Sequence, residues 1–228
     1  MKSEARALSL WEDKLAVGLR GFGPLGIFAI LCILYATWYA PPLAFLMVLV
    51  WTPLSRTPWR EIGYVLPKRW AVEMIVGLVF GCVLKLLMKA VVMPLLGADP
   101  INHAYHFLVG NRAAIPGILL TILVAAVGEE TLFRGYLFER LGKALGPSVG
   151  AQGTIVLLTS FWFGLNHFVL MGAAGFENAA VFSLVFGAVY AVTRRLWLLM
   201  FAHFAADFVA FAIIYWGMEA KVAHWVFR

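Results

Sequence analysis

The sequence predicts an all-α polytopic transmembrane bundle of about seven spanning helices, within a range of six to eight. Hydrophobic residues make up 63% of the 228 residues and charged residues only 13%, whereas a soluble chain of this length needs far more charge to cover its surface. The apolar residues gather in long windows whose edges carry Trp, as expected near lipid headgroups. Lipid requires every backbone polar group to be paired internally, and the alternating pattern of a barrel is absent, so the spans are predicted to be helices.

Residues 1–22 mix both charge signs ahead of the first apolar window and lack a small-residue cleavage site. We therefore expect a cytoplasmic amphipathic lead-in rather than a removed signal peptide. Seven apolar windows follow, against a requirement of roughly 17 to 25 residues for a spanning helix. These windows are residues 23–40, 41–54, 70–96, 115–138, 153–172, 179–193 and 196–216.

The window 41–54 is short for a span, and Pro41 and Pro42 either kink one long helix or begin a second one. Two crossings place most of the 18 Lys and Arg residues on one side of the membrane, as the positive-inside rule requires, whereas one kinked helix would split them. We therefore expect an integral protein of a bacterial inner membrane with a cytoplasmic N-terminus and an external C-terminus. The basic residues expected in the cytoplasm are Lys2, Arg6, Lys14, Arg20, Arg56, Arg60, Lys68, Arg69, Arg134, Arg140, Lys143, Arg194 and Arg195.

The whole chain, residues 1–228, is expected to form one membrane domain, because no internal repeat is evident. The polar, aromatic segment 57–70 is predicted to lie along the cytoplasmic interface. The net charge of +6 does not indicate a nucleic-acid partner, since the basic residues are dispersed among loops. Cys32 and Cys82 lie inside apolar windows and are predicted to be small buried hydrophobes rather than a disulfide or a metal site.

An ionisable residue at mid-membrane costs roughly 2.5 to 3.5 kcal/mol, so each one needs a partner or a function. The stretch "EETLFRG" supplies the first such cluster. Glu130 and Arg134 are four residues apart and share one helix face, while Glu129 is turned about 100° away and can face a cavity. The alternative is that both acids only mark the cytoplasmic end of a helix.

Two further clusters lie in later windows. The stretch "FGLNH" places Asn166 and His167 in the window 153–172, and "HFAAD" places His203 and Asp207 four residues apart on one face of the last window. The alternatives are a hydrogen-bonded core histidine and a neutral pair that joins helices. Together the three clusters supply a carboxylate base, two imidazoles and a second carboxylate. Such groups activate water beside a divalent metal such as zinc, or without a metal in an acid-base site.

In this order, the motifs EExxxR, FxxxH and HxxxN/D resemble those of the CPBP intramembrane proteases. That family includes the CAAX prenyl endopeptidases and the Abi proteins, which act in bacteriocin processing and immunity. The resemblance covers residues 115–216, and the first hundred residues agree only in being hydrophobic. It implies a protease that acts on a membrane-associated peptide or protein, lipidated in the CAAX case.

The resemblance also implies roles for individual residues. Glu129 would be the general base, His167 would help to hold the attacking water, and Glu130 with Arg134 would organise the site. His203 and the residue at position 207 would polarise the scissile carbonyl group and stabilise its oxyanion. If a metal is present, His167 and His203 are its expected ligands.

The residue at position 207 is Asp, whereas the prenyl endopeptidases characteristically carry Asn at the matching position. An ionised carboxylate cannot donate a hydrogen bond to an oxyanion. Asp207 is therefore protonated by its apolar surroundings, or orients His203, or ligates a metal.

The remaining ionisable residues have weaker interpretations. His103 and His106 lie three apart in an external loop, where an exposed polar segment is expected rather than a metal site. Lys85 and Lys89 share one face of the window 70–96. Lys89 is expected to extend outward, and Lys85 either meets a carboxylate of the substrate or takes part in helix packing or extends outward as well.

The leading hypothesis is thus an intramembrane endopeptidase. The alternative is a non-catalytic membrane immunity or partner-binding protein on the same fold. A proton- or ion-coupled transporter is disfavoured, because the windows show no pair of interrupted helices in corresponding halves.

Overall fold

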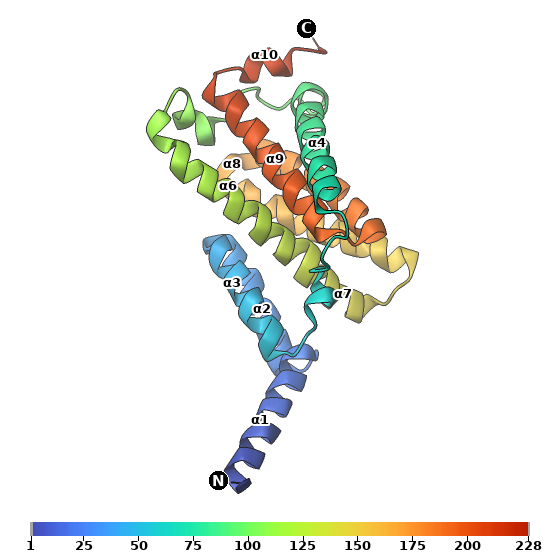
Figure 1. Ribbon diagram of the computed structural model, residues 1–228. Helices are drawn as coiled ribbons and strands as arrows, with labels where there is room; N and C mark the ends of the chain where they lie inside the picture. Colours follow the sequence, from blue (N-terminus) through green and yellow to red (C-terminus); the bar gives the residue numbers. More distant parts are fainter. Residues whose placement is uncertain (1, 228) are drawn as a thin grey trace.

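The computed structural model describes the backbone of residues 2–227 and the side chains of residues 10–227. Over this range the chain is helical and contains no strand (Figure 1), which confirms the predicted all-α class. The α-helices are α1 (Lys2–Arg20), α2 (Pro24–Tyr39), α3 (Pro41–Leu54), α4 (Trp70–Leu87), α5 (Met93–Leu95), α6 (Ile115–Glu130), α7 (Leu137–Leu145), α8 (Val149–Thr193), α9 (Leu196–Tyr215) and α10 (Glu219–Ala223). Short 3₁₀ segments are η1 (Trp59–Ile62), η3 (His103–Leu108) and η4 (Arg112–Ala114), and π-helical segments are η2 (Met88–Val92) and η5 (Thr131–Tyr136).

Four helical elements within the described residues are long and apolar enough to cross a membrane. They are Trp70–Leu95, Arg112–Leu145, Val149–Thr193 and Leu196–Tyr215. The number becomes five if α1 and α2, which meet at a bend of 59°, count as one span. This count is lower than the predicted seven because it takes α8 as one span and leaves out the shorter α3, and two structural features explain the difference.

The first feature is that α8 is a helical hairpin. Gly172 has φ 63° and ψ −156°, a conformation that is open essentially to glycine alone. The two arms, 149–171 and 173–193, then pack side by side, with the rings of Phe161 and Phe176 5.8 Å apart. Arg194 Nη2 also donates to Gln152 Oε1 at 2.8 Å. The predicted windows 153–172 and 179–193 thus correspond to the two arms of α8, and the residues between the windows are helical as well.

The second feature is the hairpin of α2 and α3. Ile33 and Ala36 of α2 share a buried core cluster with Ala44 and Val48 of α3, so the chain turns back at Pro41. The structure therefore contains two helices at this point, as predicted, rather than one kinked helix. At 16 and 14 residues, however, both are shorter than a span ordinarily requires.

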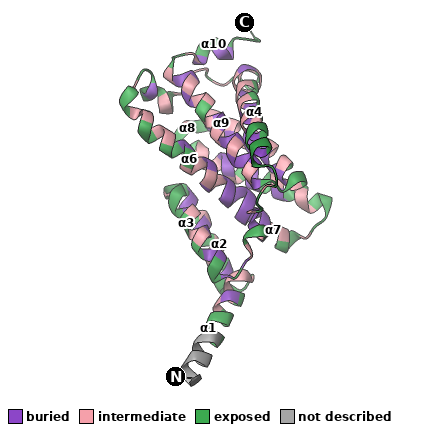
Figure 2. Ribbon diagram, viewed as in Figure 1, coloured by how far each residue is buried: buried purple, intermediate pink, exposed green. Residues whose placement is uncertain are grey.

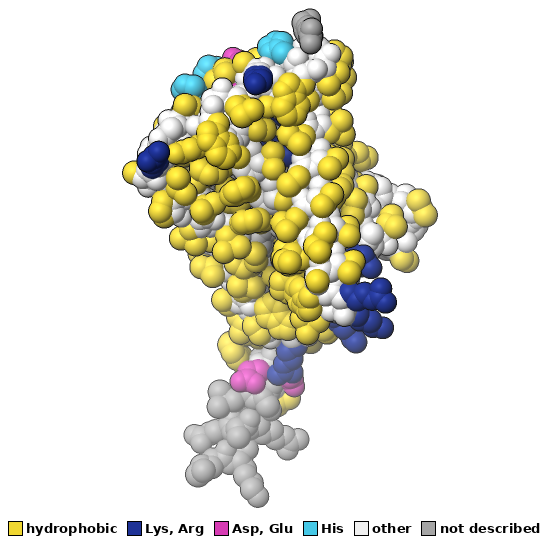
Figure 3. Space-filling model, turned by 45° about the horizontal axis from the view of Figure 1, so that its top comes forward, with side chains coloured by type: hydrophobic (Ala, Val, Ile, Leu, Met, Phe, Trp, Pro, Cys, Tyr) yellow, Lys and Arg dark blue, Asp and Glu magenta, His cyan; other side chains and the backbone are white. Residues whose placement is uncertain are grey.

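The basic loops gather at one end of the molecule. Glu61 of η1 accepts hydrogen bonds from Arg20 of α1 at 2.9 Å and from Lys143 of α7 at 2.8 Å. The hydrogen bond from Lys143, aided by Arg20, lowers the pKa of Glu61. Arg195, before α9, lies 3.6 Å from Glu73 of α4. Figure 3 shows Lys and Arg clustered at this end of the visible face. The described basic residues of the loops therefore gather as predicted from the positive-inside rule, whereas Arg134, also predicted to be cytoplasmic, is fully buried between the helices. The side chains of Lys2 and Arg6, and Arg228, which was predicted to be external, lie outside the described residues.

Apolar side chains cover the middle of the molecule. Leu31, Val79, Leu123 and Phe168 lie on four different elements and expose between 51% and 58% of their surface. Figure 3 shows such side chains as a continuous band on the visible face, while Figure 2 shows the buried residues concentrated where α6 and α9 meet. Exposed apolar surface on this scale fits a lipid environment. Cys32 and Cys82 are partly buried and unpaired, as predicted.

Helices α4 and α9 approach closely because two glycines of α4 carry no side chain at the contact. A Cβ atom on Gly77 would lie 2.6 Å from the carbonyl oxygen of Leu198, and one on Gly81 would overlap the carbonyl group of Ala202. From the first contact to the second, the position moves four residues forward in α4 and four residues forward in α9. The two helices therefore run parallel. The same register places Lys85, one turn after Gly81, level with the cavity residues beside Ala206.

Gly81→Ala tests this packing. The added methyl group must push α4 away from α9, and overpacking of this kind costs about 1–3 kcal/mol, which outweighs the helix propensity of about 1 kcal/mol that Ala gains over Gly. We expect a lower midpoint of thermal unfolding in detergent.

The matched control is Gly153→Ala on α8, because nothing lies within 4 Å of a Cβ atom added there. Its unfolding midpoint should stay the same or rise slightly. Equal midpoints for Gly81→Ala and the wild-type protein would contradict the contact.

Candidate active site

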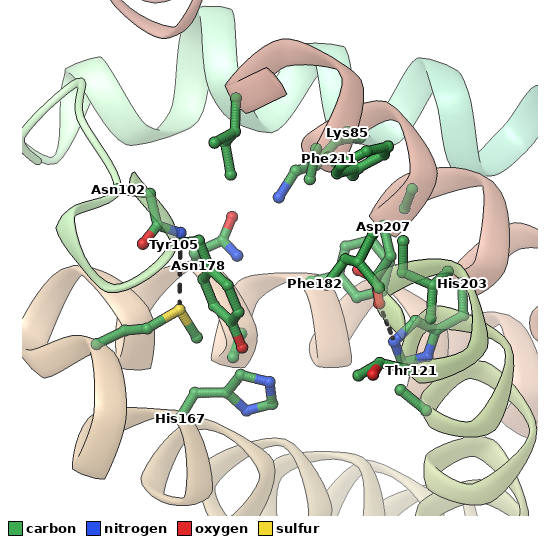
Figure 4. Close-up of a pocket in the computed structure, with 18 of the residues that line it drawn as sticks. Lys85, Asn102, Tyr105, Thr121, His167, Asn178, Phe182, His203, Asp207 and Phe211 are labelled. Carbon is green, nitrogen blue, oxygen red and sulfur yellow. Dashed lines mark hydrogen bonds and ion pairs between the residues drawn. The ribbon is translucent and has the colours of Figure 1, made fainter. Parts of the chain in front are cut away.

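A cavity of about 250 Å³ lies between α4, α6, α8 and α9 and beneath η3. Figure 4 shows the side chains that point into it. All four residues that the sequence predicts to be catalytic line this cavity: Glu129, His167, His203 and Asp207. Thr121 of α6 and Ile214 of α9 line its other end. The cavity therefore extends from Glu129 toward the end of the bundle that lies opposite the basic loops.

His203 of α9 is held by Glu130 of α6. The Nδ1 atom of His203 lies 2.7 Å from Glu130 Oε1, and Nη1 of Arg134 donates to the same oxygen at 3.1 Å. Glu130 and Arg134 have no exposed side-chain surface, and His203 has only 5%. A carboxylate paired with a guanidinium only accepts hydrogen bonds, so we assign the Nδ1 proton to His203.

Arg134 connects this pair to the second arm of α8. Its Nη2 atom donates to the carbonyl and hydroxyl oxygens of Ser183 at 3.2 and 2.9 Å. The guanidinium carbon lies 5.3 and 5.5 Å from the ring centroids of Phe163 and Phe186. A buried cation needs such partners to offset its loss of hydration. Arg134 belongs to the π-helical segment η5, whose six residues are all buried.

The other ring nitrogen of His203 faces two carboxylates. Its Nε2 atom lies 3.4 Å from Asp207 Oδ2 and 3.7 Å from Glu129 Oε2. The Glu129 and Asp207 side chains are 21% and 37% exposed, and this surface faces the cavity. The adjacent residues Glu129 and Glu130 thus lie in different environments, because successive helical positions point in different directions. The His203 ring is thus oriented by the hydrogen bond between its Nδ1 atom and Glu130, rather than by Asp207.

His167 approaches from the first arm of α8. Its Nδ1 atom donates to the carbonyl oxygen of Phe163 at 2.9 Å, which leaves the lone pair on Nε2. The Phe163 ring lies 4.6 Å from the His167 ring and 6.4 Å from the His203 ring, so it is a neighbour of both imidazoles. Glu129 and His167 also line a smaller cavity of about 20 Å³ together with Asn166.

The arrangement does not fit the expected divalent metal. In the part of the chain that the structure describes, no group of three or more His, Cys, Asp or Glu side chains is placed to hold a metal ion. The Nδ1 hydrogen bonds of His167 and His203 leave only Nε2 of each ring as a possible ligand, and a catalytic zinc site ordinarily has three protein ligands.

Several polar residues of the cavity were not predicted as part of the site. Asn102, Tyr105 and Asn178 all line it, together with Lys85, for which the sequence left an anion of the substrate as one possibility. A signal existed for Asn178, which is one of the few polar residues in a largely apolar arm. His103 lies away from the cavity, where it is exposed and pairs with Asp99 at 2.9 Å.

Comparison with known proteins gives one match, to part of the chain. Residues 111–209 match the family of type II CAAX prenyl endopeptidases described as Rce1-like, and the match includes all six predicted site residues. The first 110 residues lie outside the match. No curated protein and no solved structure matches the chain. Residues 111–209 are thus similar to the type II CAAX prenyl endopeptidases described as Rce1-like, which are proteases.

Proposed function

We propose that the protein is an intramembrane endopeptidase in which a water molecule activated by Glu129 hydrolyses a peptide bond. One observation carries this proposal. Glu129 Oε2 and His203 Nε2 lie 3.7 Å apart at the wall of one cavity. A base and a hydrogen-bond donor at this separation can act on one water molecule and one carbonyl group.

In the first step, Glu129 accepts a proton from water while the water oxygen attacks the carbonyl carbon. His167 supports the attack, because its Nε2 lone pair can accept the second hydrogen bond of the same water. The carbonyl oxygen becomes negatively charged in the tetrahedral intermediate. Nε2–H of a protonated His203 donates to this oxygen and stabilises it.

In the second step, the intermediate collapses and the C–N bond breaks. Protonated Glu129 passes its proton to the leaving nitrogen, which departs as an amine. The other product carries the new carboxyl group, and Glu129 returns to its ionised form. The substrate gains the elements of one water molecule, so the reaction needs no oxidant, reductant or further reactant.

Asp207 has a different role from the Asn of the prenyl endopeptidases. Its position 3.4 Å from His203 Nε2 suits a carboxylate that keeps the imidazole charged, because an opposite charge at this distance favours the protonated form. An ionised Asp207 would repel an oxyanion. We therefore assign the stabilising hydrogen bond to His203 alone.

The end of the molecule where the basic loops gather indicates how the protein is oriented in the membrane. We infer that this end faces the cytoplasm of a bacterial cell, with the protein in the inner membrane. The catalytic residues then lie on the cytoplasmic side of a cavity that extends toward the outer face. Its largely apolar lining suits a membrane-associated peptide, lipidated or plain.

Glu129→Gln should lower the rate constant of cleavage by about 10² to 10⁴, because the amide keeps the shape of the side chain but removes the base. Reconstituted protein incubated with prenylated and plain peptide libraries, followed by mass spectrometry, measures this loss. Glu177→Gln on α8 is the matched control, since Glu177 does not line the cavity. Unchanged cleavage by Glu129→Gln would contradict the proposal. If the biological effect survives without cleavage, the non-catalytic alternative is supported.

The two adjacent glutamates should differ in their effect on stability. Glu130→Gln leaves buried Arg134 without its charged partner, and breaking a buried pair in this way costs about 3–5 kcal/mol. Thermal unfolding in one detergent should therefore show a clearly lower midpoint for Glu130→Gln and little change for Glu129→Gln. Equal shifts for both variants would show that the division between a structural and a catalytic acid is wrong.

Cleavage should continue after treatment with EDTA or 1,10-phenanthroline, because the described residues do not converge as three metal ligands. The initial rate before and after dialysis against chelator provides the measurement. If chelator abolishes cleavage and added zinc restores it, the protein uses a metal, and the site must rearrange to bind it.

A further inference from the structure

Four cations stand directly before the two helices that begin at the basic end of the molecule. Lys68 and Arg69 precede α4, and Arg194 and Arg195 precede α9. All four residues are exposed. Because α4 and α9 run parallel, their starts lie at the same end of the bundle, where Figure 3 shows Lys and Arg side chains gathered on the surface.

Contacts between the two helix starts bring these cations into one region. The rings of Trp70 and Trp197, in the first turns of α4 and α9, lie 4.9 Å apart. Arg195 Nη1 also lies 3.6 Å from Oε2 of Glu73, which is in the first turn of α4. The cations before the two helices therefore form one surface, called here the helix-start surface, which consists of Lys68, Arg69, Arg194 and Arg195.

Acidic side chains pair with other cations at this end, but hardly with the helix-start surface. Arg20 and Lys143 lie 2.9 and 2.8 Å from Glu61 Oε2. Of the four cations of the helix-start surface, only Arg195 forms an ion pair with a described residue, the longer contact to Glu73. This surface therefore keeps most of its positive charge.

The backbone adds positive charge at the same place. The N-terminus of a helix carries a partial positive charge, which acids stabilise and cations do not. Arg69 and Arg195 are the N-cap residues of α4 and α9, and neither side chain caps its helix. The first turn of α9 contains no acid. Side chains and backbone together thus favour an anion at this surface.

Exposed apolar side chains next to the cations indicate which kind of anion fits. Val65 and Leu66 shortly precede Lys68 and are 56% and 74% exposed, and Trp70 is 42% exposed. Apolar residues and Trp beside cations are typical of a segment at the boundary between lipid and water. A phospholipid therefore fits better than a soluble anion, because its acyl chains can cover the apolar side chains.

We propose that the helix-start surface binds the phosphate group of an anionic phospholipid. Guanidinium and ammonium groups donate charge-assisted hydrogen bonds to phosphate oxygens, and basic groups between membrane helices suit such headgroups. One headgroup that contacts the residues before both helices would hold the starts of α4 and α9 together. Because α9 carries His203, the lipid would also steady a helix of the candidate active site. The inference does not depend on proteolytic activity, and its test measures binding.

Native mass spectrometry of the purified protein in detergent tests this inference. The protein is titrated with phosphatidylglycerol or with phosphatidylcholine of the same acyl chains, and we expect the wild-type protein to bind phosphatidylglycerol more tightly. Lys68→Gln combined with Arg69→Gln should raise the Kd for phosphatidylglycerol roughly 10- to 30-fold, since each cation near a headgroup contributes about fivefold. The Kd for phosphatidylcholine should change little. Both residues are exposed, so the unfolding midpoint without lipid should stay the same.

The matched control is Arg112→Gln combined with Lys221→Gln, which removes the same charge from exposed residues at the opposite end. Its Kd for phosphatidylglycerol should equal that of the wild-type protein. Phosphatidylglycerol should also raise the unfolding midpoint of the wild-type protein and of this control more than that of the Lys68 and Arg69 double variant.

Three results would overturn the inference. The first is equal binding of both lipids by the wild-type protein. The second is a preference for phosphatidylglycerol that persists in the folded Lys68 and Arg69 double variant, or that the control loses to the same extent. The third is displacement of the lipid by millimolar inorganic phosphate, which would indicate a site for a soluble anion instead.

Discussion

The buried hydrogen bonds of Glu130 are the interaction on which the rest of the site depends. One carboxylate oxygen accepts from Arg134 and contacts His203, in an interior where an unpartnered charge would cost several kcal/mol. Because these three residues come from α6, η5 and α9, the need to pair them fixes how the helices meet. The pairing also turns His203 Nε2 toward the cavity and leaves Glu129 available there.

Close backbone contacts allow this pairing. Glycine at positions 77 and 81 lets α4 approach α9, and the reversal at Gly172 folds α8 into two adjacent arms. The first arm supplies His167 and the second supplies Asn178 and Ser183. Small residues are well suited to such contacts in lipid, where van der Waals packing replaces the hydrophobic effect as the force between helices.

Much of the site could be predicted from sequence, because helical spacing places residues four apart on one face. This rule identified the pair Glu130 and Arg134 and the pair His203 and Asp207, and composition identified the all-helical membrane fold. The reversal at Gly172 could not be predicted, since the polar residues Glu177 and Asn178 resemble a loop. Asn102 and Tyr105 were also missed, because only the three-dimensional arrangement brings the segment around η3 over the cavity. The register between α4 and α9 likewise depends on contacts that no single window contains.

The central claim is that water activated by Glu129 cleaves the substrate, and isotope incorporation tests it most directly. Cleavage in H₂¹⁸O by the reconstituted protein should place one ¹⁸O atom in the new C-terminal carboxyl group of the product. Under the same conditions, folded Glu129→Gln should form essentially none of this labelled product. Labelled product from Glu129→Gln at the wild-type rate, or wild-type cleavage without the label, would contradict the account.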